Sequence, residues 1–187
     1  MEAQWSEPSE AHAPPPGRAR YPLTGLANAL TATLLIEAVG WLASLVWPTD
    51  GPVTLAAFVP SAILFLVWFR RARINADSSD WHQRRAIGWA VGGWFVPLAS
   101  AWIPFQVMAD IWRAGLPADR RSRRAVLLGF WWLCWLLSLT IKGAPRQVTA
   151  HPAIYVSMDI PSGVAAAVSA VLLIVIVRKV SGRGVVG

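Results

Sequence analysis

Apolar residues gather in five long segments, and the short stretches between them hold nearly all the charges. The segments run from Leu23 to Trp47, Gly51 to Phe69, Ala86 to Ala109, Ala125 to Ile141 and Ile160 to Val177. A helix rises about 1.5 Å per residue and the hydrocarbon core of a bilayer is about 30 Å thick, so about 20 apolar residues cross it. The pattern therefore predicts an all-α integral membrane protein.

The third segment differs from the others because glycine and proline interrupt it. The interruptions are Gly88, Gly92, Gly93, Pro97 and Pro104. We expect a helix from Ala86 to Val96, which would be about 16 Å long, or half of the hydrocarbon core. Pro97 ends or kinks that helix, because its ring clashes with the carbonyl four residues back.

The end of this segment has a helical period with two different faces. Phe105, Met108, Ile111 and Trp112 share one face, whereas Gln106, Asp110 and Arg113 share the other. This pattern predicts an amphipathic helix from Phe105 to Arg113 that lies at the cytoplasmic membrane interface.

The positions of the basic residues decide the number of spans. The chain has 17 Lys and Arg residues and a net charge of +7. If the third segment enters and leaves on one side, only Lys142 and Arg146 lie outside, as the positive-inside rule favours. Five spans would divide the charges almost evenly. We therefore predict four transmembrane helices plus a Pro/Gly-broken re-entrant or interfacial helical segment, with both termini cytoplasmic; a kinked fifth span is the alternative.

The two ends of the chain are more polar than its middle. Residues 1–21 are rich in Pro and Ala, with Pro14, Pro15 and Pro16 in succession. Proline fixes φ and removes a backbone donor, so we expect a disordered cytoplasmic tail. The first charges of the tail are acidic, unlike those of a signal peptide. The predicted organisation is this tail, a membrane domain at 22–182 and a short C-terminal tail at 183–187.

Composition argues against a soluble protein and against a recognisable reaction. Hydrophobic residues make up 55% of the chain and charged residues 14%, compared with about 25% charged in soluble domains. Cys134 is the one cysteine, which excludes an intramolecular disulfide. The three histidines lie in separate polar stretches, so no metal site is predicted. No catalytic motif or phosphate loop occurs, and we predict neither enzymatic activity nor a cofactor.

Glu37 is the candidate residue for chemistry inside the membrane. A carboxylate at mid-span costs about 2.5–3.5 kcal/mol on insertion scales. Thr33, Gly40 and Ser44 share its helix face, and we expect that stripe to point into the bundle. One interpretation is a proton or cation relay, or a ligand for a polar substrate. The other, which we favour, is a protonated Glu that hydrogen-bonds a neighbouring helix.

Tryptophans and small residues predict how the helices pack. Trp47 and Trp68 end the first two spans, where indole prefers the headgroup level. The deeper tryptophans of the fourth span, Trp131, Trp132 and Trp135, are expected to pack against the broken segment. Gly163, Ala167 and Ala170 line one side of the last span and allow close helix approach. Their partner is either a helix of this chain or a second copy.

The basic run from Asp119 to Arg124 raises the question of nucleic acid. Because this run precedes a membrane span, positive flanks and anionic lipid already account for it. The predicted partners are the lipid bilayer, anionic lipid at the basic cytoplasmic loops, and a second copy or another protein, with no nucleic acid.

Two stretches together carry a resemblance to a known family. The first is FLVWFRRARINA, with Arg73 and Asn75; the second is GWAVGGWFVPLASAWIPFQVMADIWRA, with Trp94, Pro97, Pro104, Gln106, Asp110 and Trp112. Over about residues 25 to 182 the chain resembles a bacterial, mainly actinobacterial, membrane family, domain of unknown function 4328. The resemblance implies a location in the bacterial cytoplasmic membrane and no known substrate.

The motif residues suggest a bracing role. We expect the Asn75 amide to hydrogen-bond the backbone that Pro97 or Pro104 leaves unpaired, and Gln106 to do the same from the other side. The sequence thus favours a non-enzymatic structural or partner-binding membrane component. A small transporter or channel subunit that uses Glu37 is the alternative, and a membrane-embedded enzyme comes third.

Overall fold

The computed structural model describes residues 21–43, 51–79, 82–120, 125–142 and 152–183. The regular elements in these ranges are all helical, which confirms the predicted all-α class. The long helices are α1 (Thr24–Ala43), α2 (Gly51–Asp77), α5 (Val126–Lys142) and α6 (Pro152–Arg183). The short elements are α3 (Trp89–Gly92), η1 (Ala99–Ala101), α4 (Ile103–Ala114) and η2 (Ala118–Arg120). Except for Tyr21, the N-terminal tail lies outside the described residues, as do 184–187 of the C-terminal tail.

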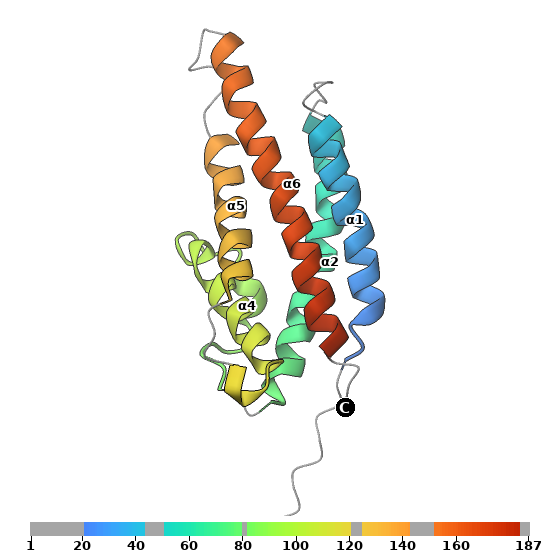
Figure 1. The fold of residues 1–187 in the computed structure, drawn as a ribbon, viewed down its shortest axis with the longest axis vertical. Coiled ribbons are helices and arrows are strands. Elements are labelled where there is room, and N and C mark those ends of the chain that lie inside the picture. The colour runs from blue at the N-terminus through green and yellow to red at the C-terminus, as the bar shows by residue number, and fades with distance from the viewer. Residues whose placement is uncertain (1–20, 44–50, 80–81, 121–124, 143–151, 184–187) are drawn as a thin grey trace, which may run out of the picture.

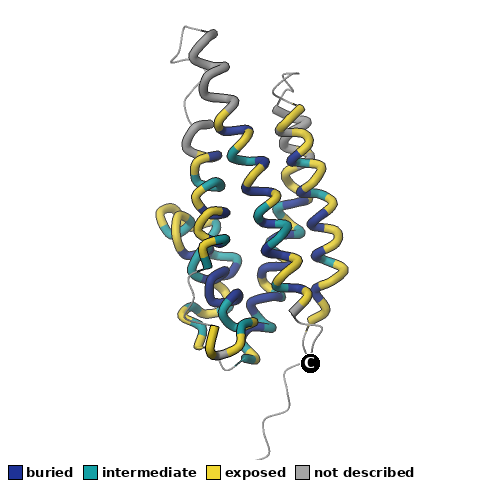
Figure 2. The backbone as a smooth tube through the Cα atoms, viewed as in Figure 1, coloured by how far each residue is buried: buried dark blue, intermediate teal, exposed yellow. Residues whose placement is uncertain are grey.

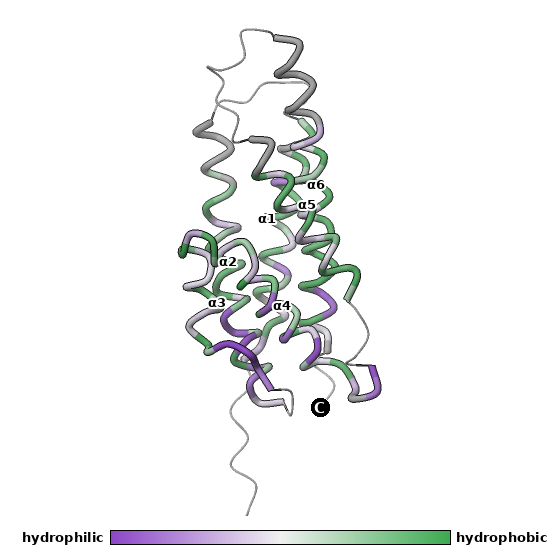
Figure 3. Tube along the Cα trace, turned by 90° about the vertical axis from the view of Figure 1, so that its left-hand side faces the viewer, coloured by the Kyte–Doolittle hydropathy of each residue, from purple (hydrophilic) through white to green (hydrophobic). Residues whose placement is uncertain are grey.

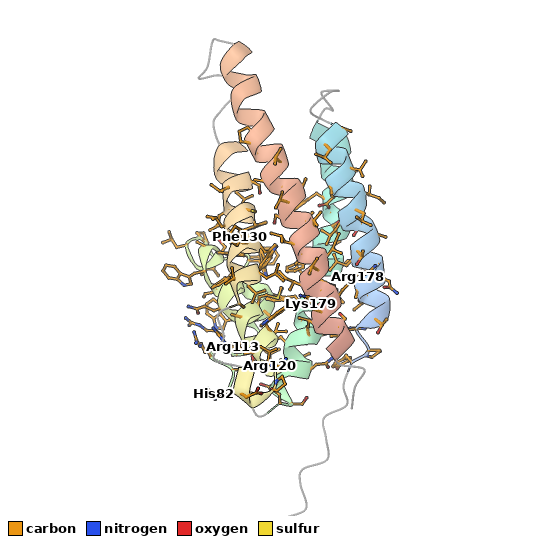
Figure 4. The ribbon with its side chains drawn as sticks, in the orientation of Figure 1. His82, Arg113, Arg120, Phe130, Arg178 and Lys179 are labelled. Atoms are coloured by element: carbon orange, nitrogen blue, oxygen red, sulfur yellow. The ribbon has the colours of Figure 1, made fainter. Side chains whose placement is uncertain are left out.

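The four long helices stand side by side and alternate in direction (Figure 1). α6 packs against α1 and α5, and α1 packs against α2. α1 and α5 begin, and α2 and α6 end, at the same end of the bundle. That end carries most of the described arginines, including Arg113, Arg120 and Arg178 in Figure 4, and we call it the basic end.

Residues 82–120, which we call the connecting segment, join α2 to α5 and hold the short elements. The segment leaves the basic end, rises about half-way along the bundle and returns to the basic end (Figure 1). Its largest helix, α4, packs against α2 and, to a smaller extent, against α3 and α5. The broken third segment therefore starts and finishes at one end of the bundle, as the charge pattern predicts.

The core lies between the long helices and α4. Its largest fully buried side chains include Leu30, Trp68, Phe69, Met108 and Trp131. Figure 2 shows that each long helix buries one side and exposes the other. Because a buried position recurs every three or four residues, the inward stripe on α1 follows the helical period.

The inward stripe on α1 is not the expected one. It contains Leu23, Ala27, Leu30, Leu34 and Ala38. Of the predicted polar stripe, Thr33 and Glu37 are half-buried, Gly40 is exposed, and Ser44 lies outside the described residues. The prediction that this stripe points into the bundle is thus correct only in part, because the apolar stripe beside it takes the central place.

The small residues of α6 pack inside the chain. Gly163, Ala167 and Ala170 are buried, and α6 contacts both α1 and α5. The partner for this stripe is therefore within the same chain.

The outer faces of the long helices are apolar. Exposed large side chains include Leu35, Ile36 and Val39 on α1, Phe58 and Ile63 on α2, Phe130 and Leu133 on α5, and Val164 and Val171 on α6. Figure 3 shows hydrophobic residues along the helices and hydrophilic residues concentrated at the basic end.

One stretch of the described residues is long and apolar enough to cross a membrane. It is Pro161–Gly182 in α6, which contains an 18-residue window with a mean hydropathy of 2.2. Thr24–Gly40 and Val126–Leu139 are shorter apolar stretches. By length and composition this stretch gives weak support for membrane association.

Candidate functional site

The helix expected from Ala86 to Val96 is much shorter than predicted. α3 comprises only Trp89–Gly92, and turns follow it. Gly93 follows α3, and a Cβ at this position would lie 2.8 Å from Trp89 O and 2.9 Å from Ile103 Cγ2, so a larger residue fits here only if its neighbours shift. The chain turns where it passes close to the start of α4. The helix ends at Gly92, before the chain reaches Pro97.

Neither proline lies at a position where a helix needs the backbone N–H that proline lacks. Pro97 lies in a turn, and its carbonyl accepts a 2.7 Å hydrogen bond from Ala99 N. Pro104 lies in the first turn of α4, where a helix needs no backbone N–H. The expectation that Asn75 or Gln106 braces backbone freed by these prolines is therefore wrong.

A tryptophan of α5 braces the broken segment instead. Trp132 Nε1 donates a 3.0 Å hydrogen bond to Ala101 O in η1. Trp94 packs edge-on against Trp132 and Trp135, with ring centroids 6.0 and 5.3 Å away. Phe65 of α2 contacts the other side of Trp94 at 5.3 Å. The prediction that the α5 tryptophans pack against the broken segment is confirmed, and Trp94 lies at the centre of the cluster.

Asn75 binds the residue that precedes α1. Its Nδ2 donates to Tyr21 O at 2.9 Å, and its Oδ1 accepts from Tyr21 N at 2.8 Å. The Arg71 guanidinium lies 5.6 Å from the centroid of the Tyr21 ring. The Asn75 side chain, at the end of α2, thus bonds both the backbone N–H and the carbonyl of Tyr21, just before α1 begins.

Arg73 is buried and ties α2 to the connecting segment. Its Nη2 donates a 2.6 Å hydrogen bond to Arg85 O, and its Nη1 lies 3.2 Å from Asp77 Oδ1. Gln106 Oε1 in turn accepts from Arg85 Nε and Nη2 at 3.4 and 3.3 Å. Gln106 therefore binds an arginine side chain rather than a broken backbone. These contacts join α2, α4 and the loop between them.

Asp110 is buried on what the sequence predicts to be the polar face of α4. Its side chain is 2% exposed, and its Oδ2 accepts from Arg84 N at 3.2 Å. Its Oδ1 lies 3.7 Å from Arg84 Nε and 3.6 Å from Arg113 Nη1. The loop around Arg84 covers this face, and Trp112 is buried as well. Both faces of this helix are therefore packed inside the chain, and its expected place at the membrane interface stays a prediction.

Trp68 also differs from its expected headgroup position. It is fully buried, and its Nε1 donates a 3.0 Å hydrogen bond to Ser181 Oγ of α6. The indole therefore joins two long helices near the basic end. Trp47 lies outside the described residues.

Glu37 faces α2. Its side chain hydrogen-bonds that of Ser61. Its Oε1 is buried and has no hydrogen-bond partner among the described residues. The geometry matches the expectation of a Glu that hydrogen-bonds a neighbouring helix.

An open pocket of about 490 Å³ lies at the basic end. Its walls come from the start of α1 and the ends of α2, α4 and α6, and include Tyr21, Asn75, Leu116 and Ser181. Asn75 is the one candidate residue in this wall. The pocket therefore borders the contact between Asn75 and Tyr21.

The candidate residues do not come together in one site. Arg73, Gln106 and Asp110 meet through Arg84 and Arg85, which we call the polar network. Trp94 belongs to the aromatic cluster, while Glu37 and Asn75 lie apart. The sequence interpretation missed the roles of Arg84, Arg85, Tyr21 and Ser181. The spacing of Arg73 and Asp77, four residues apart on a helix, was a signal for one contact of the network.

Comparison with known proteins yields one match. A family model described as Domain of unknown function (DUF4328) matches residues 31–182. That range covers α2–α6 and most of α1. No curated protein and no solved structure matches the chain.

Proposed function

Since the chain belongs to the family of the domain of unknown function DUF4328, we propose from its own residues that it is a four-span membrane protein of the bacterial cytoplasmic membrane. In this proposal α1, α2, α5 and α6 cross the bilayer, the connecting segment is re-entrant, and both termini are cytoplasmic. The protein acts without catalysis, as a structural or partner-binding component.

The apolar outer surface of the long helices carries the proposal. Soluble monomers rarely expose continuous apolar patches larger than a few hundred Å². Here large apolar side chains face outward on all four long helices, from Ile36 and Ile63 to Phe130 and Val171. A bilayer would cover this surface, and the basic end would face the cytoplasm, where arginine is retained.

The polar network supports an architectural role for the motif. Arg73, Gln106 and Asp110 each hydrogen-bond other groups of the same chain. A substrate site would instead aim such groups into a cavity. We infer that the motif locks the connecting segment onto α2. Partners would then meet the exposed cations of the basic end, among them Arg84 and Arg120, so we expect acidic partners or anionic lipid.

Thiol labelling in whole cells tests the topology. Single cysteines at Ser78 and Ser122 are placed in a Cys134→Ala background, with Thr149→Cys as the control on the opposite side. An impermeant maleimide should label Thr149→Cys in intact cells, and should reach the other two sites only in inverted vesicles. Labelling of one of Ser78 and Ser122 but not the other in intact cells would mean that the connecting segment spans, and the proposal would fail.

A small transporter or channel subunit is the second candidate. The buried Glu37 Oε1 without a hydrogen-bond partner among the described residues favours it, since such an atom can accept a proton. Glu37→Gln keeps the shape and removes the titration. Loss of solute or proton flux in proteoliposomes with unchanged expression would favour transport, whereas unchanged behaviour in every assay would favour the structural role.

A further inference from the structure

The top of the connecting segment exposes an apolar tip made of Phe95, Val96, Leu98 and Trp102. Phe95 is 72% exposed, Leu98 85% and Trp102 59%. The tip projects sideways from the bundle about half-way along it (Figure 1). Leu98 has a φ of 65°, a backbone conformation that is rare for leucine, and this turn carries the most exposed side chain of the tip. An exposed apolar surface of this kind marks a contact with lipid or with another molecule.

We propose that the outer side of the connecting segment binds an anionic phospholipid of the cytoplasmic leaflet. The acyl chains lie against the apolar tip, and the phosphate lies at Arg84. This inference rests on the proposed four-span topology and adds to it a lipid class and a binding face.

The backbone of the tip is suited to hydrocarbon. Irregular backbone is tolerated at membrane depth only where its polar groups are satisfied. Turns bond much of this backbone locally, with Phe95 N donating to Gly92 O, Ser100 N to Val96 O and Trp102 N to Ala99 O. Trp132 Nε1 bonds Ala101 O from the neighbouring helix. The chain thus reverses direction while keeping these groups paired.

The length of α4 matches one leaflet. From Ile103 to Ala114 the helix has 12 residues. Its length is about 18 Å, slightly more than half of a hydrocarbon core about 30 Å thick. With the tip at mid-bundle, Arg113 at the other end of α4 comes to the level of the phosphates. Trp89, on the rising side of the segment, is also partly exposed.

The base of the same segment is cationic. Arg113 and Arg120 lie below the tip on its side of the bundle (Figure 4). Arg84 has a side chain that is 55% exposed, whereas the carboxylate of Asp110 beside it is 2% exposed. Although Asp110 offsets part of its charge, the exposed Arg84 guanidinium can donate hydrogen bonds to phosphate oxygens. The segment therefore offers cations at one end and apolar side chains at the other, as a phospholipid requires.

A second copy of the chain fits the tip less well than lipid. Helices associate in bilayers mainly through small residues, which allow close backbone approach. The tip instead presents Phe, Val, Leu and Trp, and apolar side chains of this size gain little from leaving lipid for another protein. The tip is therefore better explained as a lipid contact.

Spin labels test the position of the tip. Leu98→Cys, with Phe130→Cys on the outer face of α5 and Ser78→Cys near the basic end, are each made in the Cys134→Ala chain. The labelled proteins are placed in nanodiscs of phosphatidylcholine and phosphatidylglycerol. Collisions with oxygen should dominate at residues 98 and 130, and collisions with a water-soluble nickel complex at residue 78.

The pattern of labels separates the two proposals. A nickel-accessible residue 98 beside an oxygen-accessible residue 130 would overturn the lipid contact but leave the four spans standing. A nickel-accessible residue 130 would overturn the four spans. If residue 98 is shielded from both reagents, a second copy covers the tip, and the lipid contact is wrong.

Lipid retention tests the headgroup. The detergent-purified chain is mixed with phosphatidylglycerol or phosphatidylcholine, and bound lipid is counted by native mass spectrometry. Arg84→Gln should weaken phosphatidylglycerol binding about fivefold, the expected effect of one surface cation. Arg178→Gln removes the same charge at an exposed position of α6, away from the tip. It should change phosphatidylglycerol binding by less than twofold. Equal losses in both variants, or none in Arg84→Gln, would overturn the assignment.

Discussion

Trp68 of α2 donates its indole N–H to the hydroxyl of Ser181 on α6, at 3.0 Å and with both residues buried. The two residues are 113 positions apart in the chain. This bond joins α2 to the last turn of α6. It lies beside the pocket at the basic end, whose wall includes Ser181.

Removing the Ser181 hydroxyl should therefore destabilise the bundle. Ser181→Ala leaves the buried indole N–H without its acceptor, and we expect a loss of about 1–2 kcal/mol in the free energy of unfolding. Ser138→Ala is the control, because that hydroxyl bonds the Trp135 carbonyl of its own helix. Unfolding in mixed micelles measures both. A double-mutant cycle with Trp68→Phe should show coupling, and additive losses would mean that the bond contributes nothing.

Asp110 should matter far more than Asp119 although each lies beside an arginine. Asp110→Asn removes a buried charge that faces Arg84 and Arg113, and should cost about 1–3 kcal/mol. Asp119→Asn should cost less than about 0.5 kcal/mol, since its side chain is 74% exposed. Thermal unfolding in detergent compares the two variants. Equal stabilities would contradict the locking role of the polar network.

Substitution by alanine should affect the free energy of unfolding differently at Gly93 and at its neighbour Gly92. Gly93→Ala places a Cβ 2.8 Å from Trp89 O and 2.9 Å from Ile103 Cγ2, so α3 and the start of α4 must move apart. We expect a loss of about 1–3 kcal/mol, as for other overpacked sites. Gly92→Ala meets nothing within 4 Å and should be neutral or slightly stabilising. If both variants melt alike, close approach is not the reason for this glycine.

Asn75 should hold the entrance to α1. Asn75→Ala removes two hydrogen bonds to Tyr21 and should lower the free energy of unfolding by about 1–2 kcal/mol. Asn75→Asp keeps the acceptor but loses the donor, and should fall in between. Asn28→Ala, at an exposed position of α1, is the matched control and should have little effect. Limited proteolysis near Tyr21 provides a second measurement, because the released entrance should be cut faster.

The broken segment shows how much of the structure a local sequence pattern predicts. Its glycines and prolines correctly predict an interrupted helix, and the placement of arginines correctly predicts that both of its ends share one end of the bundle. The point of interruption was misplaced: α3 already ends at Gly92, and the chain turns where Gly93 passes close to Ile103. Steric contacts of that kind depend on how two segments meet, and no periodicity reports them.

The sequence pattern also did not predict the hydrogen-bond partners of the polar motif residues. Asn75, Gln106 and Asp110 stand out in the sequence as polar residues in apolar surroundings. Their acceptors and donors are Tyr21, Arg85 and Arg84, and the first lies 54 residues away. Trp68 likewise has the position of an interfacial tryptophan, yet it pairs with Ser181.

Sequence alone determined the helical class, the apolar outer surface and the basic end, because hydropathy, helix period and charge are properties of each residue and its near neighbours. Tertiary structure decided which polar groups meet, since a hydrogen bond requires two atoms to come within about 3 Å. For Arg73 and the Arg85 carbonyl that condition is met only after α2 and the connecting segment have packed together.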